Sequence, residues 1–190
     1  MAALSIVVRV DKKKHPLITN KVGKCVILCQ IVENPSPISQ LTGEFEATVD
    51  AKSRFLLPAG LKKQLPEGER VFVINRGFDK CLSLYPLYSW NPIIEQIAAK
   101  SDFDANVRNF RRAFMAGATH VELDSAGRLL LPPSLKEWAG IGKDIILNGA
   151  LNKVEIWDVR KYKEFFDDMS TDDFSNLADV VMGGSNDLKL

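Results

Sequence analysis

Two stretches of this sequence, VDAKSRFLLP at residues 49–58 and LDSAGRLLLP at residues 123–132, share one pattern. In each, an Asp is followed after three residues by an Arg, then by three apolar residues and a Pro. The equivalent positions lie 74 residues apart throughout the pattern. A repeat of this kind indicates two copies of one supersecondary unit in the chain.

The sequence around each stretch predicts the same order of elements. Residues 43–50 alternate apolar and polar side chains, which is typical of a half-buried strand, and residues 54–58 predict a second strand. The short polar connection between them favours a β-hairpin. A short helix that begins with Pro and two further strands follow in each copy. Each unit therefore reads ββαββ, and because two hairpins make too little sheet to be stable alone, the copies must interlock.

Helices are predicted between and after the two copies. Apolar residues recur at helical spacing over residues 93–98 and again over residues 107–114. We expect Ser101 or Asp102 to cap the second of these helices. Residues 159–168 predict a further helix that closes the second copy.

The chain divides into four parts on this basis. We assign an N-terminal extension to residues 1–40, a first repeat with its linking helices to 41–115, a second repeat to 116–165 and an acidic tail to 166–190. The extension matches neither repeat, and we expect either a flexible arm or the product of a start codon assigned too early. The tail carries one apolar helical stripe and then a polar end that we expect to be disordered. The stripe consists of Phe174, Leu177 and Val181.

Composition excludes several classes of protein. The chain has 190 residues, with 46% apolar and 26% charged side chains, as in ordinary soluble globular proteins. No apolar run approaches the ~20 residues of a transmembrane helix. Three cysteines without a dense framework indicate a reducing, cytoplasmic compartment. Of these, Cys25 and Cys29 lack further ligands at metal-site spacing, so we expect them to fill strands.

Charge is distributed unevenly along the sequence. The net formal charge of +1 combines +4 over residues 1–40, −5 over residues 163–190 and +2 over residues 41–162. Such a nearly neutral middle can bind nucleic acid only if its basic residues gather on one face. An oligomer would multiply that face.

The sequence carries no pattern of an enzyme. His15 and His120 belong to no catalytic or metal-binding arrangement, and no Gly-rich phosphate loop of either common spacing occurs. The repeated carboxylates Asp50 and Asp124 each come with an Arg that would keep them ionised, which argues against acid–base catalysis. We therefore expect no catalysis, no cofactor and no small-molecule substrate.

The repeated Asp-x-x-x-Arg pattern has two interpretations. Across a three-residue turn, the Asp can accept hydrogen bonds from turn N–H groups and orient the Arg, whose planar fork suits phosphates or guanine edges. Alternatively, the pair is a structural ion pair that fixes the hairpin. Two copies with small neighbours, which let another backbone approach, favour the binding interpretation. The small residues are Ala51, Ser53, Ser125, Ala126 and Gly127.

Four segments of the chain resemble the MraZ family, which is of the SpoVT/AbrB type. They are GEFEATVDAKSRFLLPAGLKKQL (43–65), VINRGFDKCLSLYPLYSW (73–90), RNFRRAFMAGATHVELDSAGRLLLP (108–132) and VEIW (154–157). The resemblance covers about residues 41–165, and Ser53 departs from the Gly usual in the first motif. It implies an α+β fold in which two tandem SpoVT/AbrB-like repeats form a pseudo-symmetric swapped-hairpin β-barrel with flanking helices, assembled into a homo-oligomeric ring.

The resemblance also implies a function and a site. The family regulates transcription at the head of bacterial division and cell-wall gene clusters, so the expected partner is double-stranded promoter DNA, in the cytoplasm and associated with the nucleoid. Arg54 and Arg128 match the motif arginines that would contact DNA, and Asp50 and Asp124 match the acids that shape the turns. Lys52 adds a phosphate contact to the first turn alone, so we weight that turn more heavily.

Two other functions stay open at this point. The chain could be an AbrB-like partner of a toxin, bound through the acidic tail, or a scaffold whose Asp/Arg turns serve only folding. The remaining basic and aromatic side chains have ordinary interpretations. We expect Arg108, Arg111 and Arg112 to belong to a packing or subunit interface, leave Arg76 undecided, and expect Trp90, Trp138 and Trp157 to lie in the core.

Overall fold

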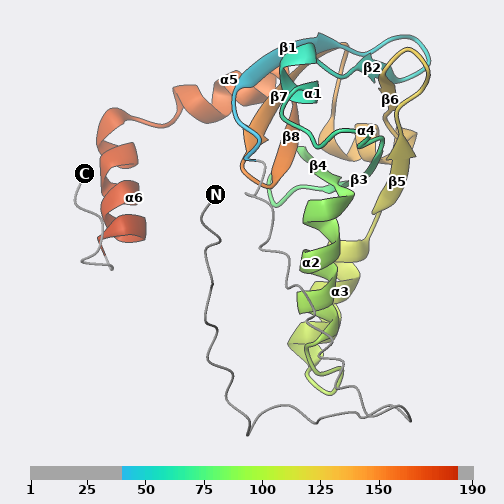
Figure 1. Ribbon diagram of the computed structural model, residues 1–190. Coiled ribbons are helices and arrows are strands. Elements are labelled where there is room, and N and C mark those ends of the chain that lie inside the picture. The colour runs from blue at the N-terminus through green and yellow to red at the C-terminus, as the bar shows by residue number, and fades with distance from the viewer. Residues whose placement is uncertain (1–39, 184–190) are drawn as a thin grey trace, which may run out of the picture. The chain divides into compact units, whose positions relative to one another are not determined.

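The computed structural model describes residues 40–183, which form two copies of the order ββαββαα (Figure 1). The first copy contains β1 (Glu44–Thr48), β2 (Arg54–Leu56), α1 (Ala59–Lys62), β3 (Val71–Arg76), β4 (Leu82–Pro86), α2 (Leu87–Ala98) and α3 (Ala105–Met115). The second contains β5 (Thr119–Glu122), β6 (Arg128–Leu130), α4 (Pro133–Ala139), β7 (Asp144–Ala150), β8 (Lys153–Asp158), α5 (Val159–Asp167) and α6 (Thr171–Met182). The predicted α+β class with two tandem repeats is confirmed.

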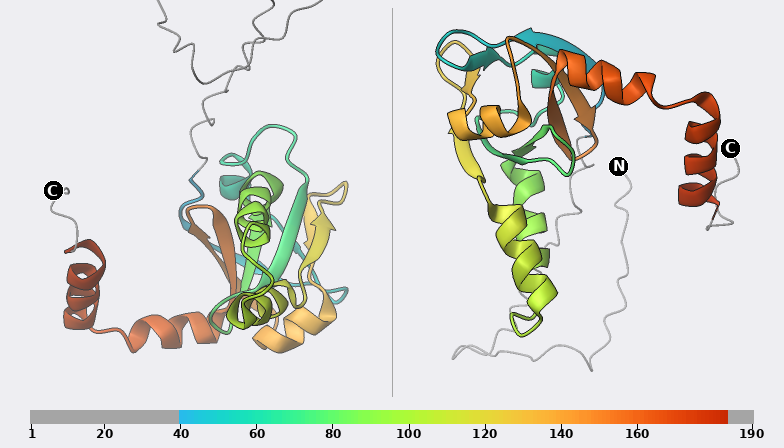
Figure 2. Two further views of the ribbon diagram at one scale, coloured as in Figure 1. Left: turned by 90° about the horizontal axis from the view of Figure 1, so that it is seen from below. Right: turned by 180° about the vertical axis from the view of Figure 1, so that it is seen from behind.

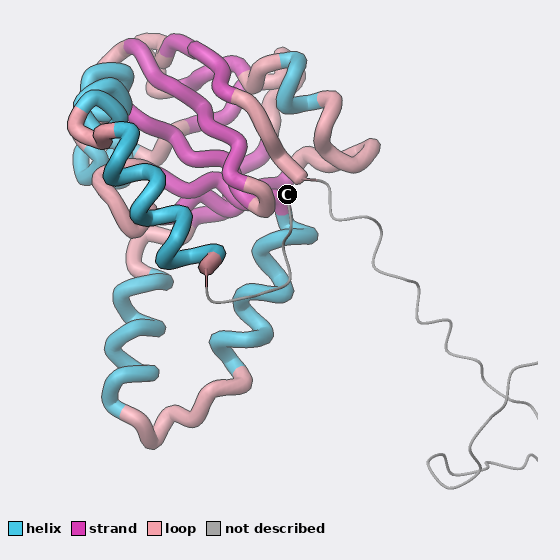
Figure 3. The backbone as a smooth tube through the Cα atoms, turned by 90° about the vertical axis from the view of Figure 1, so that its left-hand side faces the viewer, coloured by secondary structure: helices cyan, strands magenta, loops and turns pink. Residues whose placement is uncertain are grey.

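The main sheet is built from strands of both repeats, which lie side by side in the tube view (Figure 3). Its order is β1-β7-β8-β4-β3-β5, which reads the same from either edge when the repeats are exchanged. The first strand of each repeat pairs antiparallel with the third strand of the other, β1 with β7 and β5 with β3. Neither repeat can complete its sheet alone, as the sequence predicted.

The second hairpin of each repeat, β3–β4 and β7–β8, forms as predicted, but the first is much shorter than expected and the sheets do not close into a barrel. One isolated bridge joins Val49, directly after β1, to Phe55, the central residue of β2. Beyond it β1 continues along β7, while β2 leaves to pair with β6 in a separate two-stranded sheet. The main sheet therefore ends at β1 and β5, because the short strands that would close it pair with each other.

A shared core fills the space between the two sheets. Phe55 and Leu129, the central residues of β2 and β6, are 1% and 0% exposed. They pack in one cluster with side chains from the main sheet and from α1 and α4, including Leu61 and Leu135. Because equivalent residues of both repeats meet in this core, the two Asp/Arg turns beside it are held in a fixed mutual position.

Most predicted helices are found, with one change at a cap. The first residue of α3 follows Asp104, whose carboxylate accepts a hydrogen bond from the Asn106 N–H at 2.8 Å. Ser101 and Asp102 were predicted for that role, but Ser101 accepts from the Phe103 N–H and the Asp102 carboxylate pairs with Arg111. Trp90 and Trp157 are buried and Trp138 packs against the core, as predicted.

Some predictions lie outside the described residues. These include the extension over residues 1–39, with Cys25 and Cys29, and the polar end of the tail over residues 184–190. The apolar stripe of the tail lies on α6. No helix within residues 40–183 is long and apolar enough to span a bilayer.

Candidate nucleic-acid interface

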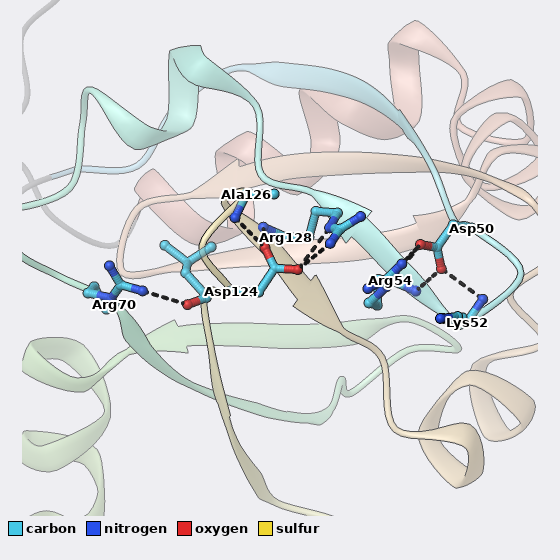
Figure 4. A network of polar contacts seen from close by, with 8 residues as sticks. Asp50, Lys52, Arg54, Arg70, Asp124, Ala126 and Arg128 are labelled. Atoms are coloured by element: carbon cyan, nitrogen blue, oxygen red, sulfur yellow. Dashed lines mark hydrogen bonds and ion pairs between the residues drawn. The ribbon is translucent and has the colours of Figure 1, made fainter.

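The first turn, residues 50–54, is closed by the side chain of its own Asp (Figure 4). Oδ1 of Asp50 accepts hydrogen bonds from the backbone N–H groups of Lys52 at 2.8 Å and Arg54 at 2.9 Å. Oδ2 accepts from the Arg54 guanidinium, through Nε at 2.9 Å and Nη2 at 2.7 Å. One carboxylate thus fixes both the path of the turn and the direction of the arginine.

The second turn, residues 124–128, repeats this geometry closely. Oδ1 of Asp124 accepts from the N–H groups of Ala126 and Arg128, both at 2.9 Å. Oδ2 accepts from Nε of Arg128 at 2.8 Å and lies 2.8 Å from its Nη2. The four residues predicted from the doubled motif therefore form two equivalent units.

Each turn needs one residue with a positive φ. Gly127 has φ +76°, a conformation that glycine adopts freely. At the equivalent place Ser53 has φ +58°, which is uncommon for a residue with a Cβ. The serine in place of glycine thus keeps the turn geometry, and its N–H donates to the Asp50 carbonyl at 2.9 Å as that of Gly127 does to Asp124.

Both turn carboxylates are ionised at neutral pH. The hydrogen bonds from Arg54 to Asp50, side chain first and then backbone, lower the pKa of this carboxyl to about 2. The backbone and then the side chain of Arg128 lower the pKa of Asp124 in the same way. Each arginine is therefore held by a permanent negative charge across the physiological range of pH.

The pairing leaves part of each guanidinium available. The Asp occupies Nε and one side of Nη2, so Nη1 and the second hydrogen of Nη2 have no partner within residues 40–183. The side chains of Arg54 and Arg128 are 28% and 36% exposed. This free end can donate two parallel hydrogen bonds to one acceptor pair, such as N7 and O6 of guanine.

The β2–β6 ribbon, Arg54–Leu56 paired with Arg128–Leu130, brings the two arginines to one surface. Arg54 lies opposite Leu130, and Leu56 lies opposite Arg128. Since side chains alternate along a strand, these four residues share the outer face while Phe55 and Leu129 enter the core. The register places the two arginine Cα atoms about 8 Å apart, from ~3.4 Å per residue and ~4.8 Å between strands.

Comparison with known proteins assigns the chain to a family. A family model described as "MraZ protein, putative antitoxin-like" matches residues 40–113 and 114–182, so each repeat matches once. The chain belongs to the MraZ family. Proteins named "Transcriptional regulator MraZ" from Christiangramia forsetii and Flavobacterium psychrophilum are 45% and 40% identical to it. Those alignments cover 77% and 79% of this chain and 95% and 96% of the relatives.

Another MraZ relative, from Cytophaga hutchinsonii, is 40% identical over 142 residues, which is 74% of this chain and 93% of that protein. The resemblance seen in the sequence is thereby confirmed. MraZ is a family of transcriptional regulators and not of enzymes. Within residues 40–183, no group of three or more His, Cys, Asp or Glu side chains could hold a metal ion.

Sequence reasoning missed two cations beside the second turn of this MraZ chain. The Nζ of Lys62, on α1 of the other repeat, lies 2.9 Å from where a Cβ on Gly127 would be. Arg70 donates from Nη2 to the carbonyl of Leu123, directly before Asp124, at 2.9 Å (Figure 4). Both contacts join the two repeats, so the spacing within one repeat gave no signal for them.

Sequence reasoning also missed two exposed leucines on the ribbon. Leu56 and Leu130 are 57% and 49% exposed, although each stands in a continuous run of apolar residues. Their exposure is unusual for leucine beside a well-packed core, and exposed apolar side chains gathered with arginines mark an interaction surface. The outer face of the ribbon thus combines two directed guanidinium groups with two apolar contacts.

Proposed function

We propose that this protein is a sequence-specific DNA-binding transcriptional regulator of the division and cell-wall gene cluster, acting in the cytoplasm at the nucleoid. The outer face of the β2–β6 ribbon is the surface that reads promoter DNA. The observation that carries this proposal is the pair of Asp-held arginines on one face of a two-stranded ribbon. A ribbon of this width enters the major groove of B-DNA, which is ~12 Å wide.

Each feature of the ribbon has a part in this recognition. The free ends of Arg54 and Arg128 donate to N7 and O6 of guanine, and their Asp partners prevent other orientations. Leu56 and Leu130 contact thymine methyl groups, which are the apolar feature of the major groove. The Cα separation of about 8 Å spans two to three base-pair steps of ~3.4 Å.

The lysines around the turns contribute sequence-independent affinity. Lys52 is exposed on the first turn, and its side chain makes no ion pair within residues 40–183. Lys62 takes the corresponding part beside the second turn. Each phosphate contact adds to affinity and steepens its dependence on salt. A ring of identical subunits repeats the basic face, which offsets the small net charge of residues 41–162.

Fluorescence anisotropy on a labelled duplex from upstream of the protein's own gene tests the proposal. The chain with both Arg54→Ala and Arg128→Ala should lose most of its preference for this duplex over a scrambled one. The matched control is Arg160→Ala, which removes an 80% exposed arginine from α5. Full binding by the double variant would reject the ribbon as the DNA-reading surface.

A second candidate function has one observation in its favour. The matching family description contains the words "antitoxin-like", and α6 presents an acidic, exposed surface that a basic toxin could bind. Under this alternative, the wild-type protein would show no salt-sensitive DNA affinity. A co-purification with the product of the adjacent gene separates the two functions.

A further inference from the structure

Helix α6 exposes an apolar stripe that no part of residues 40–183 covers. Its twelve residues are exposed along the whole helix, and Phe174, Leu177 and Val181 are 63%, 51% and 68% exposed. Three apolar side chains spaced at three and four residues lie on one side of a helix. Such a stripe on a helix at the surface indicates a partner.

The helix of the first repeat that corresponds to α6 is α3, and its contacts show how a helix at this place in a repeat packs. Helix α3 follows α2 in the first repeat as α6 follows α5 in the second. The aromatic side chains of α3 pack against α2. The ring of Phe114 stacks on Trp90 with centroids 5.6 Å apart, and Phe110 stacks on Phe114 at the same distance. Figures 1 and 2 show α2 and α3 side by side, whereas Phe174, the aromatic residue of α6, makes no ring contact within residues 40–183.

The α2–α3 hairpin carries an open apolar cleft of about 540 Å³. We call it the hairpin cleft. Its walls are mainly aromatic and aliphatic, while Gln96, Lys100 and Asn106 supply polar groups. The apolar walls comprise Phe78, Tyr85, Ile93, Ile97, Val107, Phe110 and Phe114. The cleft is large enough to accept several side chains of a helix.

The charges of the two surfaces are complementary. Helix α3 contains three arginines and no acid, whereas α6 contains three aspartates and no base. Arg112 contacts Asn109 but makes no ion pair with a carboxylate within residues 40–183, and Lys100 makes none either. An acidic helix with an apolar stripe is thus the kind of partner that the hairpin cleft fits.

We propose that α6 of one subunit docks in the hairpin cleft of a second copy of the chain. This inference rests on the proposed ring and names its interface. The two surfaces are different parts of the molecule, so the contact is heterologous, and repeated contacts of this kind close into a ring when the rotation between subunits allows it. Helix α5, which precedes α6, is anchored to the sheet, because Tyr162 donates to Glu44 of β1 at 2.7 Å. Helix α6 itself stays exposed and can meet a second copy.

Two variants of the full chain disable one surface each. Phe174→Asp with Leu177→Asp removes the stripe, and Phe110→Asp blocks the hairpin cleft. By size-exclusion chromatography with light scattering, each variant alone should have the mass of one subunit. Mixed in equal amounts they should form a complex of two, because one intact stripe and one intact cleft then remain. An interface between like surfaces would give no such complex.

Controls separate assembly from folding and from DNA binding. Phe103→Asp alters a side chain that is 98% exposed, between α2 and α3 but outside the cleft, and should keep the wild-type mass. Arg112→Glu leaves the apolar walls intact and should shift assembly to higher protein concentration. Circular dichroism reports whether each variant folds. The Arg54→Ala, Arg128→Ala chain should keep the ring mass, so loss of DNA binding and loss of assembly are distinguishable.

Several outcomes would overturn the inference. A wild-type protein with the mass of one subunit excludes the interface, whatever its DNA affinity. Stripe and cleft variants that fold and keep the wild-type mass also exclude the interface. If the melting temperatures of these variants fell as well, α6 would dock on the cleft of its own chain. A mixture that stays at one subunit would show that stripe and cleft do not bind each other.

Discussion

The substitution Arg128→Lys tests whether the second turn reads bases or merely attracts phosphates. Lysine keeps the positive charge but has no planar fork, so it cannot hold two parallel hydrogen bonds to guanine in a fixed geometry. It also lacks the Nε that Asp124 holds at 2.8 Å in the native turn. The change therefore removes the fixed orientation of the hydrogen-bond donors at this position but keeps the positive charge.

The expected magnitude follows from the lost contact. A bidentate pair with a base contributes about 1–3 kcal/mol of discrimination, which is a factor of about 5–150 per site. The ratio of affinities for the promoter duplex and a scrambled duplex should fall by this factor in each turn that is changed. The slope of log K against log salt should stay within experimental error, because no phosphate contact is lost.

Anisotropy titrations at four salt concentrations measure both quantities on the same two duplexes. Arg160→Lys, on α5, is the control for a conservative change outside the ribbon. If the specificity ratio were unchanged, a positive charge alone would suffice at this position, as at a phosphate contact, and the assignment of base reading to the Asp-held arginine would be refuted.

Three further predictions concern the surroundings of the turns. Lys62→Ala should weaken binding to all duplexes equally and reduce the salt slope by ~0.9 per subunit in contact with DNA, measured by the same titrations. Gly127→Ala should lower the free energy of unfolding by about 1 kcal/mol, because an L residue at positive φ costs ~1–2 kcal/mol and the lower entropy of the unfolded chain offsets part of this cost. Thermal melts check it, with Ser53→Ala as the control because Ser53 is already an L residue at positive φ. The pKa of Asp50 is lowered to about 2 in the folded protein, against ~3.9 in the unfolded chain. The contribution of this carboxylate to stability is therefore fully present above the unfolded pKa and is lost as the pH falls toward 2. The difference in melting temperature between wild type and Asp50→Asn should be constant from about pH 5 to 8 and shrink below about pH 4.

The doubled motif made much of this molecule predictable from sequence. The constant offset of Asp, Arg and Pro indicated two copies of one unit, and the small size of each copy indicated that they interlock. The turn geometry was also predictable, because an Asp at the start of a three-residue turn can accept from the N–H groups that follow it. The structure has both features, in the pairing of β1 with β7 and of β3 with β5 between the repeats and in the hydrogen bonds of Asp50 and Asp124.

Features that depend on contacts between the repeats could not be predicted in the same way. The runs FLL and LLL are apolar at every position, so they give no alternation from which an outer face could be recognised. Only the pairing of β2 with β6 shows that Phe55 and Leu129 enter the core while Leu56 and Leu130 face outward. Lys62 reaches the second turn across the same boundary, and Lys136 occupies its equivalent position on α4, 74 residues later.

The same pairing bears on the inequality of the two turns. Lys52 has no counterpart at Ala126, which alone would make the first turn the stronger, but Lys62 adds positive charge beside the second, where the charge of Arg70 is shared with Glu122. We therefore expect Arg54→Ala and Arg128→Ala to weaken binding by factors of similar size.

A nearly symmetric ribbon with unequal surroundings also fits a head-to-tail assembly. Two equivalent arginines on antiparallel strands would by themselves let a subunit bind DNA equally well in two opposite orientations. The different cations at the two turns make one orientation more favourable, because the phosphates near each turn are contacted differently. In a ring built through α6 and the hairpin cleft, neighbouring subunits face the same way around the circle. Unequal turns therefore give every subunit the same preferred direction on the DNA, so neighbours can bind consecutive sites without one of them having to turn round.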